Sequence, residues 1–376
     1  MAGAFFLEAS DIHIEPEEEK AKFRLRIDGV LQDVLYLDLK IYQALVSRLK
    51  LLSELKLNVR NRPQDGRFSI LVEEISVEVR TSSVPAEYGE SLVLRVLNPK
   101  WIVTMDALGL RPDLMEIFKK EIQKPNGMII STGPTGSGKT TTLYAFLQEI
   151  INPEIKIITI EDPIEYHLKG VSQTQVDKSK GYDFANGLRA IVRQDPDVIL
   201  VGEIRDLETA QISTQAALTG HLVLSTVHTN DAAGTIARLQ ALGEKSANIA
   251  PAINMAIAQR LVRKVCKKCA KSRTIAAEEF KKFSKSAKNL PKEIKAPQLT
   301  AKTKIPQVAE KGCKECNFTG YKGRIGIFET FVIDDEMEKF ILTVGSIVEM
   351  RKKAIEKGMV LMYDDGLLKV LQGITT

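Results

Sequence analysis

Apolar and polar positions alternate in the first part of the chain. In residues 22–27, every second side chain is apolar and the others are basic. The alternation resumes at 31–35, after the pair Asp28-Gly29, which suits a tight turn. Two alternating runs joined in this way predict a β-hairpin with one apolar face.

Helical spacing follows this hairpin. Residues 41–55 carry apolar groups at intervals that place them on one side of a helix. Strand-like alternation returns at 66–80 and at 91–97. Residues 1–100 are therefore expected to form a small α+β domain, followed by a linker at 101–112 that contains Gly109 and Pro112.

From residue 113 the pattern changes to continuous apolar runs, most of them separated by helical stretches. The runs lie at 127–132, 156–162, 197–203 and 221–228. Unbroken apolar strands that alternate with helices predict a parallel sheet covered on both faces. We expect an α/β core domain at 113–262 and a helical region at 331–376.

Length and composition agree with this division. The chain has 376 residues, enough for two or three domains, and is 44% hydrophobic and 27% charged. These values exclude a disordered or fibrous protein. No uncharged apolar run approaches the roughly 18 residues of a membrane span. The first ten residues contain no basic leader, so we expect a cytosolic protein without a signal peptide.

The positive charge is concentrated in one late segment. Residues 260–316 contain 17 Lys and Arg against 5 Asp and Glu, whereas the rest of the chain is net acidic. The segment includes Pro291, Pro297 and Pro306. Such a block can face nucleic acid, acidic lipid or an acidic protein, but a solvated, lysine-rich surface is a better explanation than any one of these partners. Few aromatic residues are interleaved with the lysines, which disfavours single-stranded nucleic acid as the partner.

The most specific local motif lies between the run at 127–132 and a helical stretch. It fits G-x-x-x-x-G-K-[ST] and reads Gly133, Pro134, Thr135, Gly136, Ser137, Gly138, Lys139 and Thr140. Glycines let the backbone curl so that its N–H groups face phosphates at the positive end of a helix. Lys139 is then placed to reach the β- and γ-phosphates and Thr140 to bind Mg²⁺. We predict a site for a nucleoside triphosphate.

Hydrolysis also needs carboxylates at the ends of neighbouring strands, and two runs supply them. Glu161, Asp162 and Glu165 follow the run at 156–162, and Glu203 follows Gly202 in the next run. Glu203 suits Mg²⁺ or its water, and a carboxylate facing the γ-phosphate could activate the attacking water. Capping of the following helices is the alternative role for these acids.

His221 and His228 bracket the run at 221–228. Seven residues apart on a strand, the two side chains point to opposite faces, so they are not expected to share a metal. Either histidine could sense a γ-phosphate, or be an ordinary histidine whose hydrogen bonds are satisfied.

All four cysteines fall in two C-x-x-C pairs. The pairs are Cys266 with Cys269 and Cys313 with Cys316, separated by 43 residues. Two such pairs can give four thiolates to a tetrahedral Zn²⁺. A disulfide conflicts with a cytosolic setting, and a redox pair would not ordinarily be duplicated. We predict a structural zinc subdomain at 263–330 that contains a helical excursion.

Four ordered motifs resemble those of the secretion ATPase superfamily, the ring-forming motors of type II secretion and type IV pilus assembly. They are GPTGSGKTTTLY, TIEDPIEY, RQDPDVILVGEIRD and TGHLVLSTVHTN. They are similar to the P-loop, Asp box, Walker B-like box and His box. Residues 9–16, 26–29 and 62–67 resemble the family's second N-terminal domain.

The resemblance implies a role for each site residue. Residues 133–141, including Thr141, would bind ATP, and Glu203 and Thr140 would hold Mg²⁺. Glu165 would activate water, with Glu161 and Asp162 supporting its loop. Arg80 and Arg95 correspond to arginines that reach phosphates, although each could be an ordinary outward residue of its strand. His221 and His228 match the two histidines of the His box.

The resemblance also implies a fold and a cellular role. The fold would be a small α+β domain followed by a RecA-like ATPase domain. The function would be Mg²⁺-dependent ATP hydrolysis by a ring, expected to be a hexamer, that is cytoplasmic and peripheral at the inner membrane. Its partners would be an inner-membrane platform protein and associated cytoplasmic assembly proteins. The cysteine pairs favour an extension or secretion motor. The competing hypotheses are a nucleic-acid-binding P-loop protein and a nucleotide switch without motor activity.

Overall fold

The computed structural model describes residues 2–101, 103–291, 294, 298–343 and 346–376. Met1, one position of the predicted linker, part of the predicted zinc subdomain including Pro297, and two positions of the C-terminal region lie outside the described residues. The chain divides into two compact units, with the boundary between Trp101 and Ile102.

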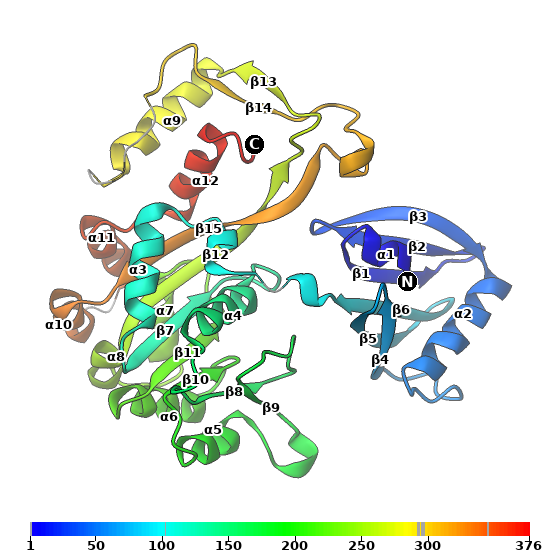
Figure 1. The fold of residues 1–376 in the computed structure, drawn as a ribbon, viewed down its shortest axis with the longest axis horizontal. Helices are drawn as coiled ribbons and strands as arrows, with labels where there is room; N and C mark the ends of the chain where they lie inside the picture. The colour runs from blue at the N-terminus through cyan, green and yellow to red at the C-terminus, as the bar shows by residue number, and fades with distance from the viewer. Residues whose placement is uncertain (1, 102, 292–293, 295–297, 344–345) are drawn as a thin grey trace. The chain divides into compact units, whose positions relative to one another are not determined.

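The first unit is built on an antiparallel sheet with the strand order β3-β2-β1-β6-β5-β4 (Figure 1). The elements are α1 (Ala2–Phe6), β1 (Ala9–Pro16), β2 (Lys20–Ile27), β3 (Val30–Asp38), α2 (Leu39–Leu52), β4 (Gln64–Val72), β5 (Ile75–Ala86) and β6 (Gly89–Leu97). The predicted hairpin is β2–β3, in which Ile27 pairs with Val30. Its turn residues, Asp28 and Gly29, have positive φ angles of 49° and 85°.

One face of this sheet is buried. Every second side chain of the central strands is apolar and packs with Phe5 of α1 and with Tyr42, Val46 and Leu49 of α2. The alternate side chains of β1, β2, β5 and β6 include many charged groups. The alternation that predicts strands therefore also separates a core face from a polar face.

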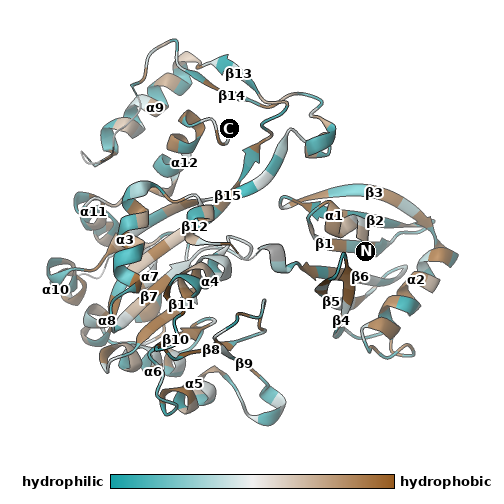
Figure 2. Cartoon of the chain, viewed as in Figure 1, coloured by the Kyte–Doolittle hydropathy of each residue, from teal (hydrophilic) through white to brown (hydrophobic). Residues whose placement is uncertain are grey.

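The second unit contains a sheet with the order β15-β12-β7-β11-β10-β8-β9. The four predicted strands are β7 (Gly127–Thr132), β8 (Ile157–Glu161), β10 (Val198–Val201) and β11 (Leu222–Val227), and they run parallel. Three further strands join them: β9 (Ser172–Gln175), β12 (Ile253–Val265) and β15 (Tyr321–Val332). Only β15 is antiparallel to its neighbour. Figure 2 shows the central strands as predominantly hydrophobic.

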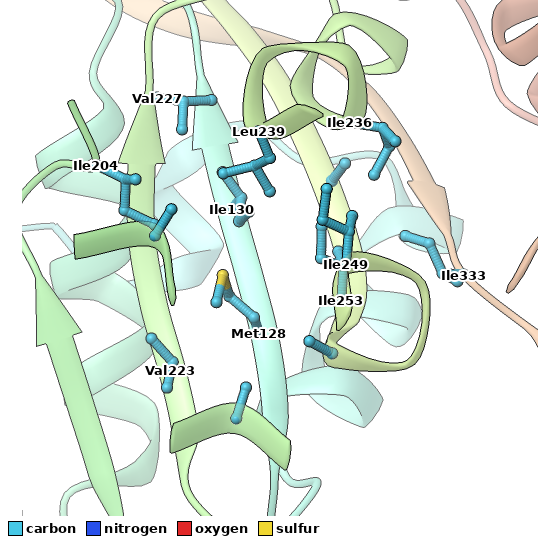
Figure 3. Packing of buried hydrophobic residues seen from close by; sticks show 14 of the residues in the cluster. Met128, Ile130, Ile204, Val223, Val227, Ile236, Leu239, Ile249, Ile253 and Ile333 are labelled. Atoms are coloured by element: carbon cyan, nitrogen blue, oxygen red, sulfur yellow. The ribbon is translucent and has the colours of Figure 1, made fainter. Parts of the chain in front are cut away.

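Helices bury both faces of this sheet. Those in the second unit are α3 (Pro112–Ile122), α4 (Lys139–Ile150), α5 (Phe184–Val192), α6 (Leu207–Leu218), α7 (Ala233–Ala241), α8 (Ser246–Ala252), α9 (Ala277–Asn289), α10 (Asp335–Thr343), α11 (Ile347–Glu356) and α12 (Met362–Leu371). Met128 and Ile130 point to one face, where they pack near Ile236 and Leu239 of α7 (Figure 3). Ile129 points to the other, with α3 and α4. None of the helices in the described residues is long and apolar enough to cross a membrane.

The predicted linker at 101–112 is shorter than expected. Met105–Leu108 forms a 3-10 helix, and α3 already begins at Pro112. Met105 and Leu108 are buried in the same core cluster as Phe118 and Phe328. Gly109 ends the 3-10 helix with a φ of 80° and Pro112 begins α3, and the apolar side chains before them belong to the core of the second unit.

The predicted zinc subdomain at 263–330 is also not a separate body. β12 and β15 are long strands of the main sheet, and the cysteine pairs lie at the end of one and before the start of the other. The excursion between them contains α9, as expected, together with a two-stranded sheet of β13 (Lys271–Thr274) and β14 (Lys304–Gln307). Ile275 and Phe283 of this excursion pack with Val370 of α12.

Candidate functional site

The phosphate loop has the curled backbone that its glycines predict. Gly133, Gly136 and Gly138 have positive φ angles of 145°, 78° and 91°. A Cβ atom on Gly133 would lie 2.6 Å from the carbonyl oxygen of Gln259, so the close approach of β12 also requires glycine there. Gly138 is the N-cap of α4, which places Thr140 and Thr141 in the first turn of that helix. Phosphate binds readily at such a helix end.

Lys139 lies across the loop. Its Nζ donates hydrogen bonds to the carbonyl oxygens of Gly133 and Pro134, at 2.8 and 3.1 Å. Burial lowers the pKa of Lys139, whereas the charge of Glu203 acts in the opposite direction. The lysine is thus desolvated and close enough to Glu203 for the two charges to interact, as a shared site for phosphate and metal requires.

The carboxyl ends of the parallel strands bring the other candidates to the same edge. Glu203 follows β10, and its side chain is largely buried, with an exposed fraction of 11%. Its two oxygens lie 2.5 Å from Nη2 of Arg205 and 3.3 Å from Nε2 of His228, which follows β11. The phosphate loop follows β7, the neighbour of β11. Lys139, Glu203 and His228 are therefore brought together at this edge.

Glu161 is buried and hydrogen-bonded, so its carboxylate is less accessible than that of a water-activating residue should be. Its oxygens accept hydrogen bonds from the hydroxyls of Tyr144 and Thr159 and from Nε2 of Gln173. Burial raises the pKa of Glu161 in spite of these bonds. Tyr144 lies on α4, directly after the phosphate loop, so Glu161 ties the end of β8 to that helix.

The residues after Glu161 form an irregular segment. Asp162 is exposed, and Glu165 is half-buried. The charge of Glu165 contributes to the raised pKa values of Glu161 and Tyr144, which places it near them. Glu161 therefore has the contacts of a supporting residue, and Glu165 lies beside it in the irregular segment.

His221 lies at the opposite edge of the sheet. Its carbonyl oxygen accepts a hydrogen bond from the N–H of Gly127, where β7 begins. Its Nδ1 lies 3.0 Å from the carbonyl oxygen of Ala216. A six-residue strand such as β7 spans about 17 Å, so His221 cannot contact a nucleotide held by the phosphate loop of its own chain. His221 and His228 therefore lie at opposite edges of the sheet, since the two ends of one strand meet different edges.

The free face of the first sheet carries a row of arginines. Cross-strand pairing places Arg26, Asp11, Arg95, Arg80 and Arg67 side by side on successive strands. Asp11 lies 3.1 Å from Arg95 and 3.5 Å from Arg26. Directly paired residues share a face of the sheet. The predicted arginines, Arg80 and Arg95, are therefore adjacent members of a longer row.

The four cysteines meet at one point. Their Sγ atoms all lie within 4.8 Å of one another. Three of the separations, Cys266–Cys313, Cys269–Cys316 and Cys313–Cys316, are 3.7, 3.8 and 3.7 Å. Ligands about 2.3 Å from a tetrahedral Zn²⁺ are about 3.8 Å apart, so the cluster has the dimensions of such a site.

Cys316 ionises more readily than an ordinary cysteine. Burial opposes the charged form of Cys316, but the N–H groups of Cys313 and Gly320 point at its sulfur and hold its pKa at about 7. Thiolates are the form that binds metal. The donor set thus fits a closed structural zinc site.

Several supporting residues were missed by sequence reasoning. Gln259 of β12 donates to the carbonyl oxygen of Ser137 at 2.9 Å and accepts from the hydroxyl of Ser131 at 3.2 Å. It therefore braces the phosphate loop from a strand that was not predicted. Arg67 could have been found by counting register from the Arg80 strand, whereas nothing in the local sequence marks Gln259 or Gln173.

The whole chain is similar to known proteins. Residues 1–376 fit the family model described as type II/IV secretion system protein. The chain is 44% identical over 374 residues to the type IV pilus assembly ATPase PilB of Thermus thermophilus, covering 99% of this chain and 41% of that protein. It is 43% identical over 371 residues to the type II secretion system protein E of Xanthomonas campestris, covering 98% of this chain and 63% of that protein.

Solved structures give the same result for the fold. The pilus retraction motor PilT with bound ADP has a TM-score of 0.59 and 26% identity, over 97% of this chain and 94% of that chain. The ATPase DotB of Legionella pneumophila has a TM-score of 0.69 at 22% identity, over 99% of this chain and 90% of that chain. By the family model and these relatives, the chain belongs to the type II/IV secretion system protein family.

Proposed function

We propose that this chain hydrolyses ATP with Mg²⁺ as part of a motor for type II secretion or type IV pilus assembly. The observation that carries the proposal is the shared edge of the second sheet. There a curled phosphate loop, a lysine, a buried carboxylate and a histidine meet although they come from three different strands. Of the two relatives compared above, one is named a type IV pilus assembly ATPase and the other a type II secretion system protein.

Each group at this edge has a chemical task. The loop N–H groups and Lys139 bind the phosphates, and Thr140 with Glu203 holds Mg²⁺. Glu165 orients the attacking water and accepts its proton, while His228 hydrogen-bonds to the γ-phosphate. Magnesium, when bound, neutralises charge on the phosphate oxygens.

The arginine row supplies further positive charge. Arg80 and Arg95 are proposed to contact the phosphates during turnover, because a planar guanidinium stabilises the charge that develops on the transferred group. The pairing of β5 with β6 places Arg80 and Arg95 opposite each other. Asp11 beside Arg95 supports this orientation.

The proposed motor function includes an assembly, a location and partners, which go beyond membership of the family. The proposed assembly is a ring, with six copies as the expected number, cytoplasmic and peripheral at the inner membrane. Its proposed partners are a platform protein of that membrane and cytoplasmic assembly proteins. The similarity to PilB and to type II secretion protein E supports this part of the proposal.

The central test is ATP turnover by the wild-type chain and by Lys139→Ala, measured as phosphate release at several protein concentrations. The wild type should turn over, with activity per chain rising as rings form. Lys139→Ala should lose at least about 100-fold in kcat because the phosphates lose a half-buried cation. Unchanged turnover in the folded variant would refute the proposal, and ATP binding without any wild-type turnover would make the chain a switch.

Zinc is proposed as the metal of the cysteine cluster. Its role is architectural, because four thiolates leave no open position on a tetrahedral ion. Metal analysis of the purified chain should find about one zinc per chain, and Cys313→Ser should reduce this content. A wild-type chain that folds and contains no metal would contradict this part of the proposal.

A further inference from the structure

The segment after β11 runs from the edge of the second sheet at which Lys139, Glu203 and His228 meet, the proposed catalytic edge, to α7. It begins with His228, whose Nε2 lies 3.3 Å from Glu203, and ends at Ala232, the N-cap of α7. At its start, the N–H of Thr229 donates to the hydroxyl of Thr132 at 2.8 Å. Thr132 is the last residue of β7, so one end of the segment is fixed to that strand, next to the phosphate loop.

The other end is fixed by a buried carboxylate that no motif marks. Glu329 lies on β15 and is only 4% exposed. Its Oε1 accepts the N–H of Ala232 at 3.0 Å, and its Oε2 accepts the N–H of Met362 at 3.3 Å. These N–H groups lie at the beginnings of α7 and α12. Two helix N-termini therefore face one carboxylate, an arrangement that favours negative charge.

Strand register explains how Glu329 reaches this segment. Glu329 pairs with Ala258, Ala258 with Thr132, and Thr132 with Val227. The four residues form one row across the sheet, with side chains on the same face. Thr132 and Glu329 are two strands apart, about 10 Å, and hold the two ends of a segment that spans the gap between them.

Other charges near Glu329 belong to the same contact region. Asp231, adjacent to Ala232, accepts the N–H of Gly234 at 2.7 Å and contacts Arg351 of α11. Burial raises the pKa of Glu329, and Asp231 acts in the same direction, whereas the two N–H groups and Arg351 act against it. The segment is thus fixed from β7, β15 and α11 at once.

From this geometry we infer that Glu329 is a positioning residue for ATP hydrolysis: it holds residues 228–232 so that His228 stays against Glu203, and it links that segment to the C-terminal helix α12. The inference rests on the proposed function. Glu329 does not touch the phosphate loop, so it acts on turnover and not on nucleotide binding. Any shift of α12 would reach the catalytic edge through the same carboxylate.

The test compares Glu329→Gln with Thr330→Val in the full chain. Gln has the same shape but offers one acceptor oxygen, so it leaves one buried N–H without a partner. Thr330 is the next residue on β15, points to the other face, and its buried hydroxyl has no hydrogen-bond partner among the described residues, which makes it a matched control. E329Q should lower kcat about tenfold or more with KM for ATP within about twofold. T330V should change neither value.

Hydrogen exchange gives a readout that does not depend on activity. Backbone N–H groups in the peptide spanning 228–236 should exchange faster in E329Q than in the wild type, and at the wild-type rate in T330V. Should E329Q fail to fold, E329D keeps the charge but has a shorter reach, and the same split between kcat and KM is expected.

Three outcomes would overturn the inference: wild-type kcat in E329Q, an equal loss of kcat and ATP affinity, or unchanged exchange at 228–236. A wild-type chain without ATPase activity would instead refute the proposed function. The exchange measurement would then still decide whether Glu329 fixes the segment.

Discussion

The two sheets of this chain place functional side chains in different ways. The sheet of the second unit is buried by helices on both faces, so its polar groups gather where the parallel strands end. The sheet of the first unit is buried on one face only, and its charged groups lie in a row across the other face. A sheet that is covered by helices on both faces can present functional groups only at its edge, whereas a sheet that is covered on one face can also present them on its uncovered face.

The difference has a consequence for how each site tolerates change. At the edge, each residue is held by its own loop and by hydrogen bonds such as that between Gln259 and Ser137. In the row, the spacing between Arg80 and Arg95 follows directly from the pairing of β5 with β6. The edge should therefore be sensitive to single supporting contacts, and the row to the charge that it presents.

The largest expected effect is at the edge. Glu203→Gln removes the charge that is proposed to hold Mg²⁺ but keeps the shape of the side chain, and kcat should fall by about 1000-fold. Phosphate release at saturating ATP and Mg²⁺ measures this loss. Glu154→Gln, an exposed acid in the same unit, serves as the control. Near-normal turnover in Glu203→Gln would show that this edge of the sheet does not take part in ATP hydrolysis.

The next effect concerns the row. Arg80→Ala and Arg95→Ala should each lower kcat by about 100-fold, since each removes a cation from the proposed phosphate contact. Arg24→Ala is a suitable comparison, because Arg24 lies on the same face, in the adjacent row, and is paired with Glu15. If Arg24→Ala lowered kcat as much as the other two variants, the arginine row would act only as part of a general positive surface.

A smaller effect separates the two edges of the second sheet. His228→Ala should lower kcat about tenfold, because it removes the partner of Glu203 at the proposed catalytic edge. His221→Ala should change kcat by less than about twofold, since His221 contacts Ala216 at the far edge. Equal losses in kcat for the two variants would show that the far edge also meets a nucleotide, necessarily one bound by another chain.

The smallest expected effect is a change in how the free energy of unfolding depends on pH. Burial raises the pKa of Glu161, so the folded chain binds more protons there than the unfolded chain does. This carboxyl therefore contributes stability below its unfolded pKa of about 4.3, and that contribution is lost as the pH rises through the folded value. The free energy of unfolding of the wild type should thus fall relative to that of Glu161→Gln as the pH rises from 4.5. Parallel denaturation curves across this range would contradict the assignment.

Local patterns predicted much of the fold. The β2–β3 hairpin, helix α2 and strands β7, β8, β10 and β11 were all evident from the spacing of apolar residues. Strands β12 and β15 were missed, because their sequences contain many basic and small residues. Their strand structure depends on pairing with each other and with β7, which no local pattern reveals.

The sequence by itself determined the chemistry of this protein: the phosphate loop, the carboxylates after two apolar runs and the four thiols are each defined by residue type and short spacing. The tertiary structure alone decided which of these groups meet. It placed His221 and His228 at opposite edges, extended two arginines into a row, and brought Gln259 and Glu329 to segments more than 90 residues away in the chain. The physical reason is that residue type fixes what a group can do, whereas strand order and register fix its neighbours.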